Sequence, residues 1–271
     1  MPTPATAAGS VPLVAYELRG RVAVLTLNRP ERHNAWTFDL ERELFDLADE
    51  ADGDDAVGAI VLTGAGISFC PGMDMAELAT LGEGAGVSAR PRPPTHLRTM
   101  RKLTLAAING GCAGVGLVQA LCCDVRFAAL EARISCAFTR RGAPAEYGSS
   151  WLLPRLIGLA DATDLMLSGR RIDAAEAERL RLVTRTAPRA ALLDLAVRYA
   201  QDVAVKCAPL AVQAVKAQLA ADASGDLAHS VLEARRIAHE PDRRPDLAEG
   251  ARAYLEKRLP RFAPLPARAQ R

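Results

Sequence analysis

Two short glycine-bearing segments hold the residues of this chain that are best suited to chemistry. They are Ser68–Asp74, with the sequence SFCPGMD, and Asn109–Gly116, with the sequence NGGCAGVG. Each follows an apolar, strand-like run and precedes an expected helix start, so its peptide N–H groups can face a ligand. The segments begin about forty residues apart, and N–H groups from both could converge on one oxygen atom. Such a main-chain oxyanion hole suits a thioester or ester carbonyl, because it stabilises the negative charge that develops there.

A carboxylate stands in a third segment, where glycine and proline interrupt the chain. Glu146 lies in the sequence RGAPAEYGSSW, just before an apolar helix predicted over Trp151–Ile157. A carboxylate that leans into an apolar wall has a raised pKa, as a group that takes up and returns protons requires. A solvated carboxylate near a helix start is the alternative interpretation of the same residue.

Composition narrows the classes of protein. With 271 residues, 49% hydrophobic content and a net charge of +2, one sizeable core is expected, and no basic excess points to nucleic acid. The six cysteines show no metal-ligand spacing, so we expect buried free thiols and no metal site. No segment has the length and apolarity of a membrane span or a secretory signal, which predicts a cytoplasmic protein.

The elements that must position these residues alternate between strands and helices, which predicts an α/β fold. A hairpin is expected over Val11–Leu18 and Val22–Leu27, followed by a helix that Thr37 caps. Further expected strands and one buried helix are Val57–Thr63, Leu105–Asn109, the helix Gly116–Cys123, and Val125–Ala128.

The last part of the chain reads as helical, with apolar positions that look exposed. The predicted helices cover Ala190–Ala204, Pro209–Ala221, Leu227–His239 and Asp246–Leu259, and they suit a packing or oligomer-forming module. We therefore expect a disordered leader over residues 1–10, a core over 11–205 and a helical region over 206–271. The segment Gly82–Pro94 lacks periodicity and is expected to be a mobile surface loop, either a tolerated insertion or a flap over the ligand.

From about Val14 to Phe262 the chain resembles the enoyl-CoA hydratase/isomerase (crotonase) superfamily. The resemblance implies a crotonase-like spiral of ββα repeats, a C-terminal helical region that makes trimers or dimers of trimers, and an acyl-CoA thioester substrate. Coenzyme A is then part of the substrate, and no separate cofactor is expected. The residues that carry the resemblance are LNRP at 27–30 with Asn34-Ala35, AVGAIVLTG at 56–64, FCPGMD at 69–74, AAING at 106–110, Cys123-Asp124, LSG at 167–169, IDAAEA at 172–177 and EKR at 256–258.

The resemblance also assigns roles to individual positions. It makes the N–H groups of Met73 and Val115 the two donors of the oxyanion hole, and Val115 stands where the family usually has glycine. A branched side chain there narrows the acyl pocket without removing the N–H. Lys257 matches a lysine that in relatives reaches the CoA phosphates, commonly across a subunit boundary; a solvated lysine is the alternative. The remaining positions assigned to ligand binding are His33, Ala35, Gly72, Asp74 and Gly114.

Hydratases of the family carry two glutamates, and the matching positions here are Val118 and Phe138. Two-glutamate hydration is therefore disfavoured. Glu146 falls where several relatives place a catalytic aspartate, which favours double-bond isomerisation with Glu146 as the acid/base. A hydratase with a non-standard site, a hydrolase or dehalogenase with Glu146 as nucleophile, and a non-catalytic acyl-CoA binder remain as alternatives. Tyr147 and Trp151 are candidates for lining the acyl pocket, and a place in the core is the equal alternative for Trp151.

Overall fold

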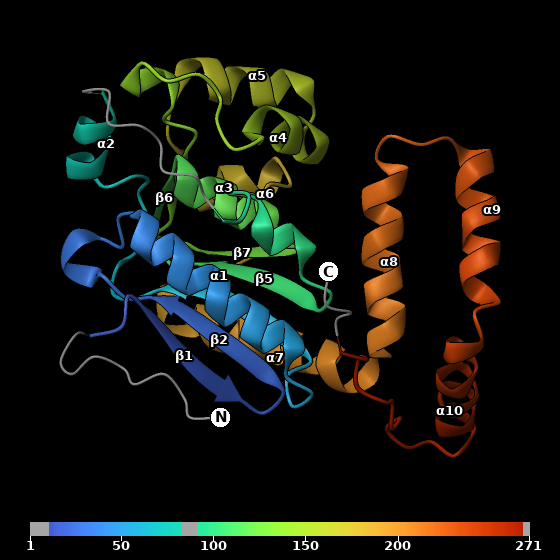
Figure 1. Cartoon of the computed structure of the whole chain (residues 1–271). Coiled ribbons are helices and arrows are strands. Elements are labelled where there is room, and N and C mark those ends of the chain that lie inside the picture. The colour runs from blue at the N-terminus through green and yellow to red at the C-terminus, as the bar shows by residue number, and fades with distance from the viewer. Residues whose placement is uncertain (1–10, 83–90, 268–271) are drawn as a thin grey trace.

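The computed structural model describes residues 11–82 and 91–267, and a six-stranded sheet forms its centre (Figure 1). The expected leader and most of the expected loop Gly82–Pro94 lie outside these residues. The hairpin is confirmed: β1 and β2 pair antiparallel, and Gly20 turns the chain between them at φ 62°. All other neighbouring strands of this sheet pair in parallel. In sheet order the strands are β1 (Val14–Arg19), β2 (Val22–Leu27), β3 (Ala59–Gly64), β5 (Leu103–Ile108), β7 (Val125–Ala129) and β10 (Arg185–Ala187).

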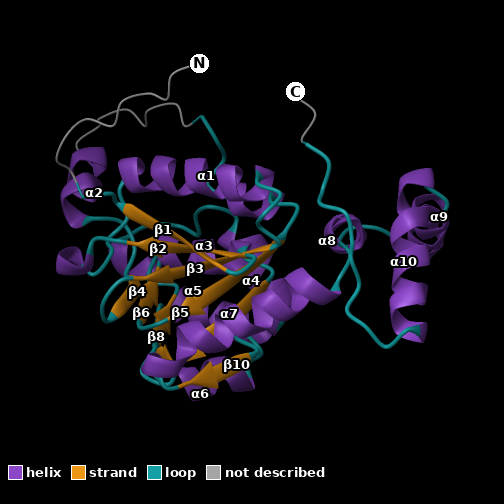
Figure 2. Cartoon of the chain, turned by 90° about the horizontal axis from the view of Figure 1, so that it is seen from below, coloured by secondary structure: helices purple, strands orange, loops and turns teal. Residues whose placement is uncertain are grey.

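The central sheet lies between two long helices, α1 (Phe38–Gly53) and α7 (Arg189–Lys206), as Figure 2 shows. Strands buried on both faces are largely apolar, and every residue of β3 and β5 is buried. Their polar residues, Thr63 and Thr104, have hydrogen-bonded hydroxyls. The predicted cap of α1 is confirmed, because the Thr37 hydroxyl accepts a hydrogen bond from the Leu40 N–H at 3.2 Å.

A second, four-stranded sheet consists of strands that the sequence patterns did not predict. Three of them have only three residues, too few to show an alternating pattern. The order is β4 (Ser68–Cys70), β6 (Gly111–Ala113), β8 (Arg133–Ser135) and β9 (Ile172–Asp173).

The two sheets are linked by a repeated unit. β3, β5 and β7 of the large sheet each continue into β4, β6 and β8 of the small one, and a helix follows. This repetition is the ββα spiral that the resemblance implies, and it brings the ends of β4 and β6 to one edge of the core. The helices of this part are α2 (Met75–Gly82), α3 (Val115–Cys122), α4 (Ser149–Ile157), α5 (Leu159–Ser168) and α6 (Ala174–Arg179).

Three C-terminal helices stand away from the sheets in Figure 1: α8 (Pro209–Asp222), α9 (Leu227–Ala238) and α10 (Arg244–Leu255). The Lys216 Nζ fastens α8 to the core by donating to the Lys102 carbonyl and the Asp124 carboxylate, both at 2.6 Å. Ala214 and Ala253 are the residues of these helices that are buried, whereas several of their leucines are largely exposed. Within the described ranges, no helix combines the length and apolarity needed to cross a bilayer.

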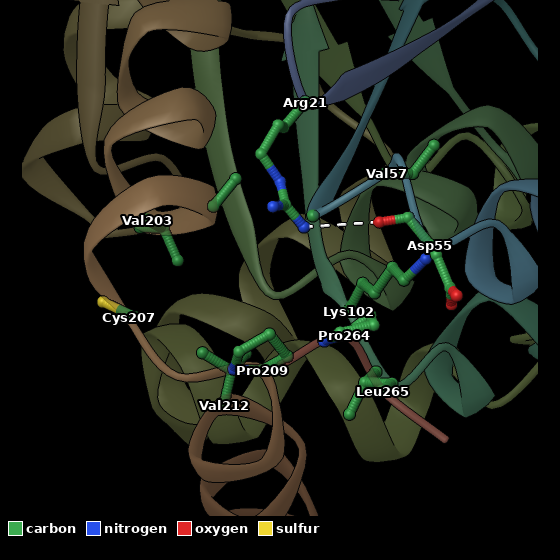
Figure 3. Close-up of a pocket in the computed structure, with 12 residues that line it drawn as sticks. Arg21, Asp55, Val57, Lys102, Val203, Cys207, Pro209, Val212, Pro264 and Leu265 are labelled. Atoms are coloured by element: carbon green, nitrogen blue, oxygen red, sulfur yellow. Dashed lines mark hydrogen bonds between the residues drawn. The ribbon is translucent and has the colours of Figure 1, made fainter. Parts of the chain in front are cut away.

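The segment with Pro264 and Leu265 returns to the core beside the junction of α7 and α8 (Figure 3). Leu265 is buried there, and the Arg101 guanidinium donates to the Pro266 carbonyl at 2.6 Å. The cavity left at this junction has a volume of about 10 Å³, room for about one water molecule. It is a packing defect under the C-terminal segment and too small for an organic substrate.

Candidate active site

A cavity of about 800 Å³ opens where the ends of β4 and β6 meet the start of α3. That volume is ample for a small organic ligand. The cavity collects residues that are far apart in sequence and that were assigned to the site. Those that line it are His33, Ala35, Gly72, Met73, Asp74, Gly114, Val115 and Glu146. Lys257 does not line it and instead follows α10.

The two glycine turns touch each other at this cavity. Gly72 and Gly114 have φ values of 113° and 51°, which side-chain-bearing residues rarely adopt. A methyl group on Gly72 would lie 3.9 Å from the Gly114 Cα, and one on Gly114 would lie 3.6 Å from the Gly72 Cα. The two turns are thus in van der Waals contact, and the positive φ values, not a lack of space, are what favour glycine at both positions.

Trp36 fixes the peptide groups on either side of Met73. The Trp36 N–H donates to the Gly72 carbonyl, and the Asp74 N–H donates to the Trp36 carbonyl, both at 2.8 Å. In such a parallel bridge the N–H of the central residue points away from the partner strand. The Met73 N–H therefore faces away from Trp36, and no backbone acceptor within residues 11–82 or 91–267 takes it.

Val115 is the first residue of α3, where backbone N–H groups have no acceptor inside the helix. The helical hydrogen bonds begin with the Val118 N–H, which donates to the Gly114 carbonyl at 3.1 Å. Every residue of α3 is buried, so the position of this helix start is set by packing. The partial positive charge of the helix N-terminus adds to the attraction for a developing oxyanion.

Arg29 holds two parts of the cavity rim together. Its hydrogen bonds join the loop before α1 to Asp74, the residue after Met73. Its guanidinium donates to the Ala35 carbonyl at 2.5 Å and to the Asp74 carboxylate at 3.1 Å. The pKa of Asp74 is lowered by the Ala76 N–H and then by Arg29, so this carboxylate stays charged at neutral pH. The Asp74 side chain is therefore engaged within the protein, and so is its backbone, whose N–H donates to Trp36 and whose carbonyl accepts from the Leu78 N–H at 2.9 Å.

Glu146 belongs to the turn between the 3₁₀ helix Thr139–Arg141 and α4, where its carbonyl accepts from the Ser149 N–H at 3.0 Å. The expected apolar wall around this residue is wrong: Glu146 is exposed at the cavity. The helix that follows, α4, buries Leu152, Leu153 and Ile157, whereas the turn before it leaves the Glu146 carboxylate on the rim. No hydrogen bond or salt bridge ties that carboxylate to another described residue, so it is available to a ligand.

The positions of the two family glutamates hold no carboxylate. Val118 is fully buried behind the cavity, whereas Phe138 lines it. Tyr147 also lines the cavity, as expected. Trp151 lies neither in the core nor among the lining residues: it is 40% exposed, and the guanidinium carbons of Arg98 and Arg155 lie 5.5 and 3.9 Å from its ring centroid.

Five arginines of the lining were not predicted as site residues: Arg32, Arg133, Arg140, Arg141 and Arg171. They come from four separate segments, because Arg140 and Arg141 are neighbours in one 3₁₀ helix. The paired arginines at 140–141 and 170–171 were the only local sign of them in the sequence. Among the described residues, no group of histidine, cysteine and carboxylate side chains could hold a metal ion.

Comparison with known proteins agrees with this architecture. The sequence model of the enoyl-CoA hydratase/isomerase family matches residues 17–264. The probable enoyl-CoA hydratase echA8 of Mycobacterium bovis is 37% identical over 250 residues, which cover 92% of this chain and 97% of that protein. The enoyl-CoA hydratase ACTT3 of Alternaria alternata is 34% identical over 260 residues, with coverages of 89% and 82%.

Solved structures show the same fold. A probable enoyl-CoA hydratase/isomerase from Mycobacterium abscessus superposes with a TM-score of 0.86 at 34% identity, covering 93% of this chain and 99% of that one. The enoyl-CoA hydratase from Mycobacterium tuberculosis H37Rv gives 0.82 at 33% identity, with coverages of 93% and 99%. The chain belongs to the enoyl-CoA hydratase/isomerase (crotonase) family, and the expected fold is confirmed.

Proposed function

We propose that this family enzyme shifts a double bond in an unsaturated acyl-CoA thioester, with Glu146 as the acid/base. The observation that carries the proposal is the contact of the Gly72 and Gly114 turns in a cavity that also holds a free carboxylate. The N–H groups of Met73 and Val115 bind the thioester oxygen in this mechanism. The segment His33–Ala35 and the turn Gly72–Asp74 lie along the CoA portion.

The proposed reaction needs one base and one electrophilic site. The Glu146 carboxylate removes a proton from the α- or γ-carbon, and the electron pair moves through the conjugated system onto the thioester oxygen. Two N–H donors stabilise that oxyanion, each by on the order of 3 kcal/mol in the transition state. The protonated Glu146 then returns the proton to the other carbon, so that the double bond moves and no atom is gained or lost.

Hydration is the second candidate, and the names of the relatives favour it. It requires a group that positions and activates a water and a group that protonates the neighbouring carbon. Val118 and Phe138 supply neither. A hydratase here would depend on Glu146 alone for both steps, which is why isomerisation is proposed first.

The test is the variant Glu146→Gln, with Glu31→Gln as a matched control, because Glu31 is another exposed carboxylate of the same cavity. For E146Q we expect kcat to fall by roughly 10²–10⁴-fold, the usual contribution of a general acid/base, with an unchanged Kd for a saturated acyl-CoA. E31Q should keep its kcat. Product analysis on an enoyl-CoA panel in deuterated water separates isomerisation, hydration and hydrolysis.

Two results would contradict the proposal. Full activity of E146Q would remove Glu146 from the mechanism. Binding of acyl-CoA thioesters without turnover by the wild type, across enoyl-, dienoyl- and hydroxyacyl-CoA substrates, would favour a non-catalytic binder.

We further infer that the active assembly is a trimer or a dimer of trimers, and that Lys257 reaches the CoA phosphates of a neighbouring subunit. Two observations support this. Lys257 lies outside the cavity of its own chain, and the helices that carry it expose large apolar side chains.

A further inference from the structure

The floor of the cavity is one face of the small sheet, in the part where β6, β8 and β9 pair. Gly111 pairs with Arg133 and Ala113 pairs with Ser135, and all four residues line the cavity. Side chains of a strand alternate between its two faces, so the intervening Ile134 points to the other side and is buried.

The register between β8 and β9 brings a second arginine to the same face. Ile134 pairs with Ile172 in an antiparallel ladder, so the residue opposite Ser135 is Arg171. Arg133 and Arg171 therefore both project over the cavity floor. The side chains of Gly111, Ala113 and Ser135 are small, so they leave space above the strands.

A third arginine, Arg140, lies at the edge of this floor. Arg140 packs its side chain against Gly169, where an added Cβ would lie 2.9 Å from the Arg140 Cγ, and its Nε donates to the Ser168 carbonyl at 2.8 Å. Ser135 holds the same segment in place, because its hydroxyl donates to the Gly169 carbonyl at 2.9 Å. Arg133, Arg140 and Arg171, hereafter the floor arginines, thus surround one small surface.

No floor arginine forms a salt bridge with a carboxylate of residues 11–82 or 91–267. Asp173 lies opposite Arg133 in the ladder, but its carboxylate caps α6 by accepting the Glu176 N–H at 2.9 Å. The neighbour Arg170 shows the contrast, since it is paired with Asp164 and Glu176 and does not line the cavity. Three unneutralised guanidinium groups repel each other, and an anion between them relieves that repulsion.

The floor arginines lie close to the oxyanion hole, on a side of the cavity different from the loop with Arg32 and His33. β6 runs from Gly111 directly into Gly114, a path of roughly 10 Å at the usual rise of a strand. The rim loop with Arg32 and His33 instead approaches through the Trp36 bridge to Met73. A ligand whose carbonyl sits in the hole can therefore carry its CoA along the rim and a second charged group over the floor.

We propose that Arg133, Arg140 and Arg171 form a binding subsite for an anionic group of the thioester ligand. The subsite rests on the proposed function, because it takes the carbonyl in the oxyanion hole as its reference point. Guanidinium groups match the planar oxygens of carboxylate and phosphate. The anion is therefore either a carboxylate at the far end of the acyl chain or a phosphate of the CoA nucleotide.

The test measures Kd by calorimetry for three saturated thioesters: glutaryl-CoA, pentanoyl-CoA and pentanoyl-pantetheine. The first carries an acyl carboxylate as well as phosphates, the second carries phosphates alone, and the third carries neither. The proteins are the wild type, Arg133→Ala, Arg171→Ala and the control Arg198→Ala, an exposed arginine of α7 outside the cavity. Because all three mutated residues are exposed, each variant is expected to unfold near the wild-type midpoint.

An acyl carboxylate in the subsite predicts that wild type binds glutaryl-CoA about tenfold more tightly than pentanoyl-CoA. R133A and R171A then lose this preference and still bind pentanoyl-CoA normally. A CoA phosphate in the subsite predicts that both variants bind both CoA thioesters about tenfold more weakly and pentanoyl-pantetheine normally. Arg133→Lys should restore part of the affinity in either case, and R198A should match the wild type.

The subsite is overturned if R133A and R171A bind all three ligands as the wild type does. It is also overturned if they lose affinity equally for all three, because pentanoyl-pantetheine has no anionic group. Failure of the proposed function looks different: the wild type would then bind these thioesters without shifting a double bond in an enoyl-CoA, and the Kd values above would still decide the subsite. A wild type that binds no CoA thioester would overturn both.

Discussion

At the scale of single residues, the cysteines are governed by burial. Cys70, Cys112, Cys122, Cys123 and Cys136 are buried, and Cys207 is exposed. Burial raises the pKa of Cys70 and Cys122 to about 12 and that of Cys136 to about 11, because an apolar surrounding disfavours the thiolate. Cys112 lines the cavity, yet burial raises its pKa too, so it is a wall residue and a poor nucleophile.

These raised pKa values predict a loss of stability in alkaline solution. The protonated thiols favour the folded state, and the unfolded chain begins to release the same protons near pH 8.5. Their contribution is therefore complete below that pH and declines as the pH rises, by about 1.4 kcal/mol per pH unit for each buried thiol. Urea unfolding between pH 7 and 10 measures this decline.

Variants separate the thiols from other groups that titrate in that range. Cys136→Ala should show a shallower decline than the wild type, because one raised pKa is gone, whereas Cys207→Ser should keep the wild-type slope. With a thiol reagent at pH 8, the native protein should react quickly at one cysteine and the denatured protein at all six. If the stability of C136A fell with pH as steeply as that of the wild type, the buried Cys136 thiol would not be a cause of the decline.

At the scale of elements, the start of α3 is positioned by a close contact with β4. A Cβ on Gly116 would collide with the Cys70 carbonyl oxygen and lie 2.7 Å from the Cys70 Cβ. Because Val115 immediately precedes Gly116, the same contact sets where the Val115 N–H lies relative to the Met73 segment.

We expect Gly116→Ala to lower the free energy of unfolding by about 1–3 kcal/mol through overpacking, and to weaken acyl-CoA binding as α3 moves. The matched control is Gly53→Ala at the end of α1, where no atom lies within 4 Å of the added Cβ. There the change should be neutral or stabilising by about 0.4–1 kcal/mol, because alanine restricts the unfolded chain. Urea midpoints and the Kd for pentanoyl-CoA measure both effects; similar midpoints for the two variants would show that the Gly116 contact is not tight.

At the scale of the whole molecule, the C-terminal helices have apolar surface that their own chain does not cover. Leu219 on α8, Leu232 on α9 and Leu255 on α10 are 69%, 65% and 79% exposed. Large apolar side chains gathered in this way are typical of a surface that packs against another subunit.

If this surface makes the trimer, Leu232→Glu combined with Leu255→Glu should yield monomers in light scattering, where the wild type gives about three or six times 28.8 kDa. The monomer should also bind CoA thioesters more weakly than the wild type does, with pantetheine thioesters unaffected, because Lys257 then cannot reach a neighbour's phosphates. Leu130→Glu, at a 53% exposed leucine of the core, is the control and should stay assembled. A monomeric wild type would refute the assembly.

What the sequence determined by itself was local in origin. Thr37 caps α1 because its hydroxyl lies three residues from the N–H it accepts, and the glycines at 72 and 114 permit φ values that few other residues adopt. Apolar runs and helical periodicity likewise predicted the central strands and the C-terminal helices. The motifs at these positions were specific enough to indicate the family, and the comparisons confirmed it.

Tertiary structure alone decided which of these residues meet and which face solvent. It brought Gly72 against Gly114, turned Arg171 into the cavity while Arg170 stayed paired outside it, and left Glu146 on the rim instead of against an apolar wall. The register of three-residue strands and the packing of helices distant in sequence set these outcomes. No local pattern encodes them, because exposure and contact depend on what the rest of the chain places alongside each residue.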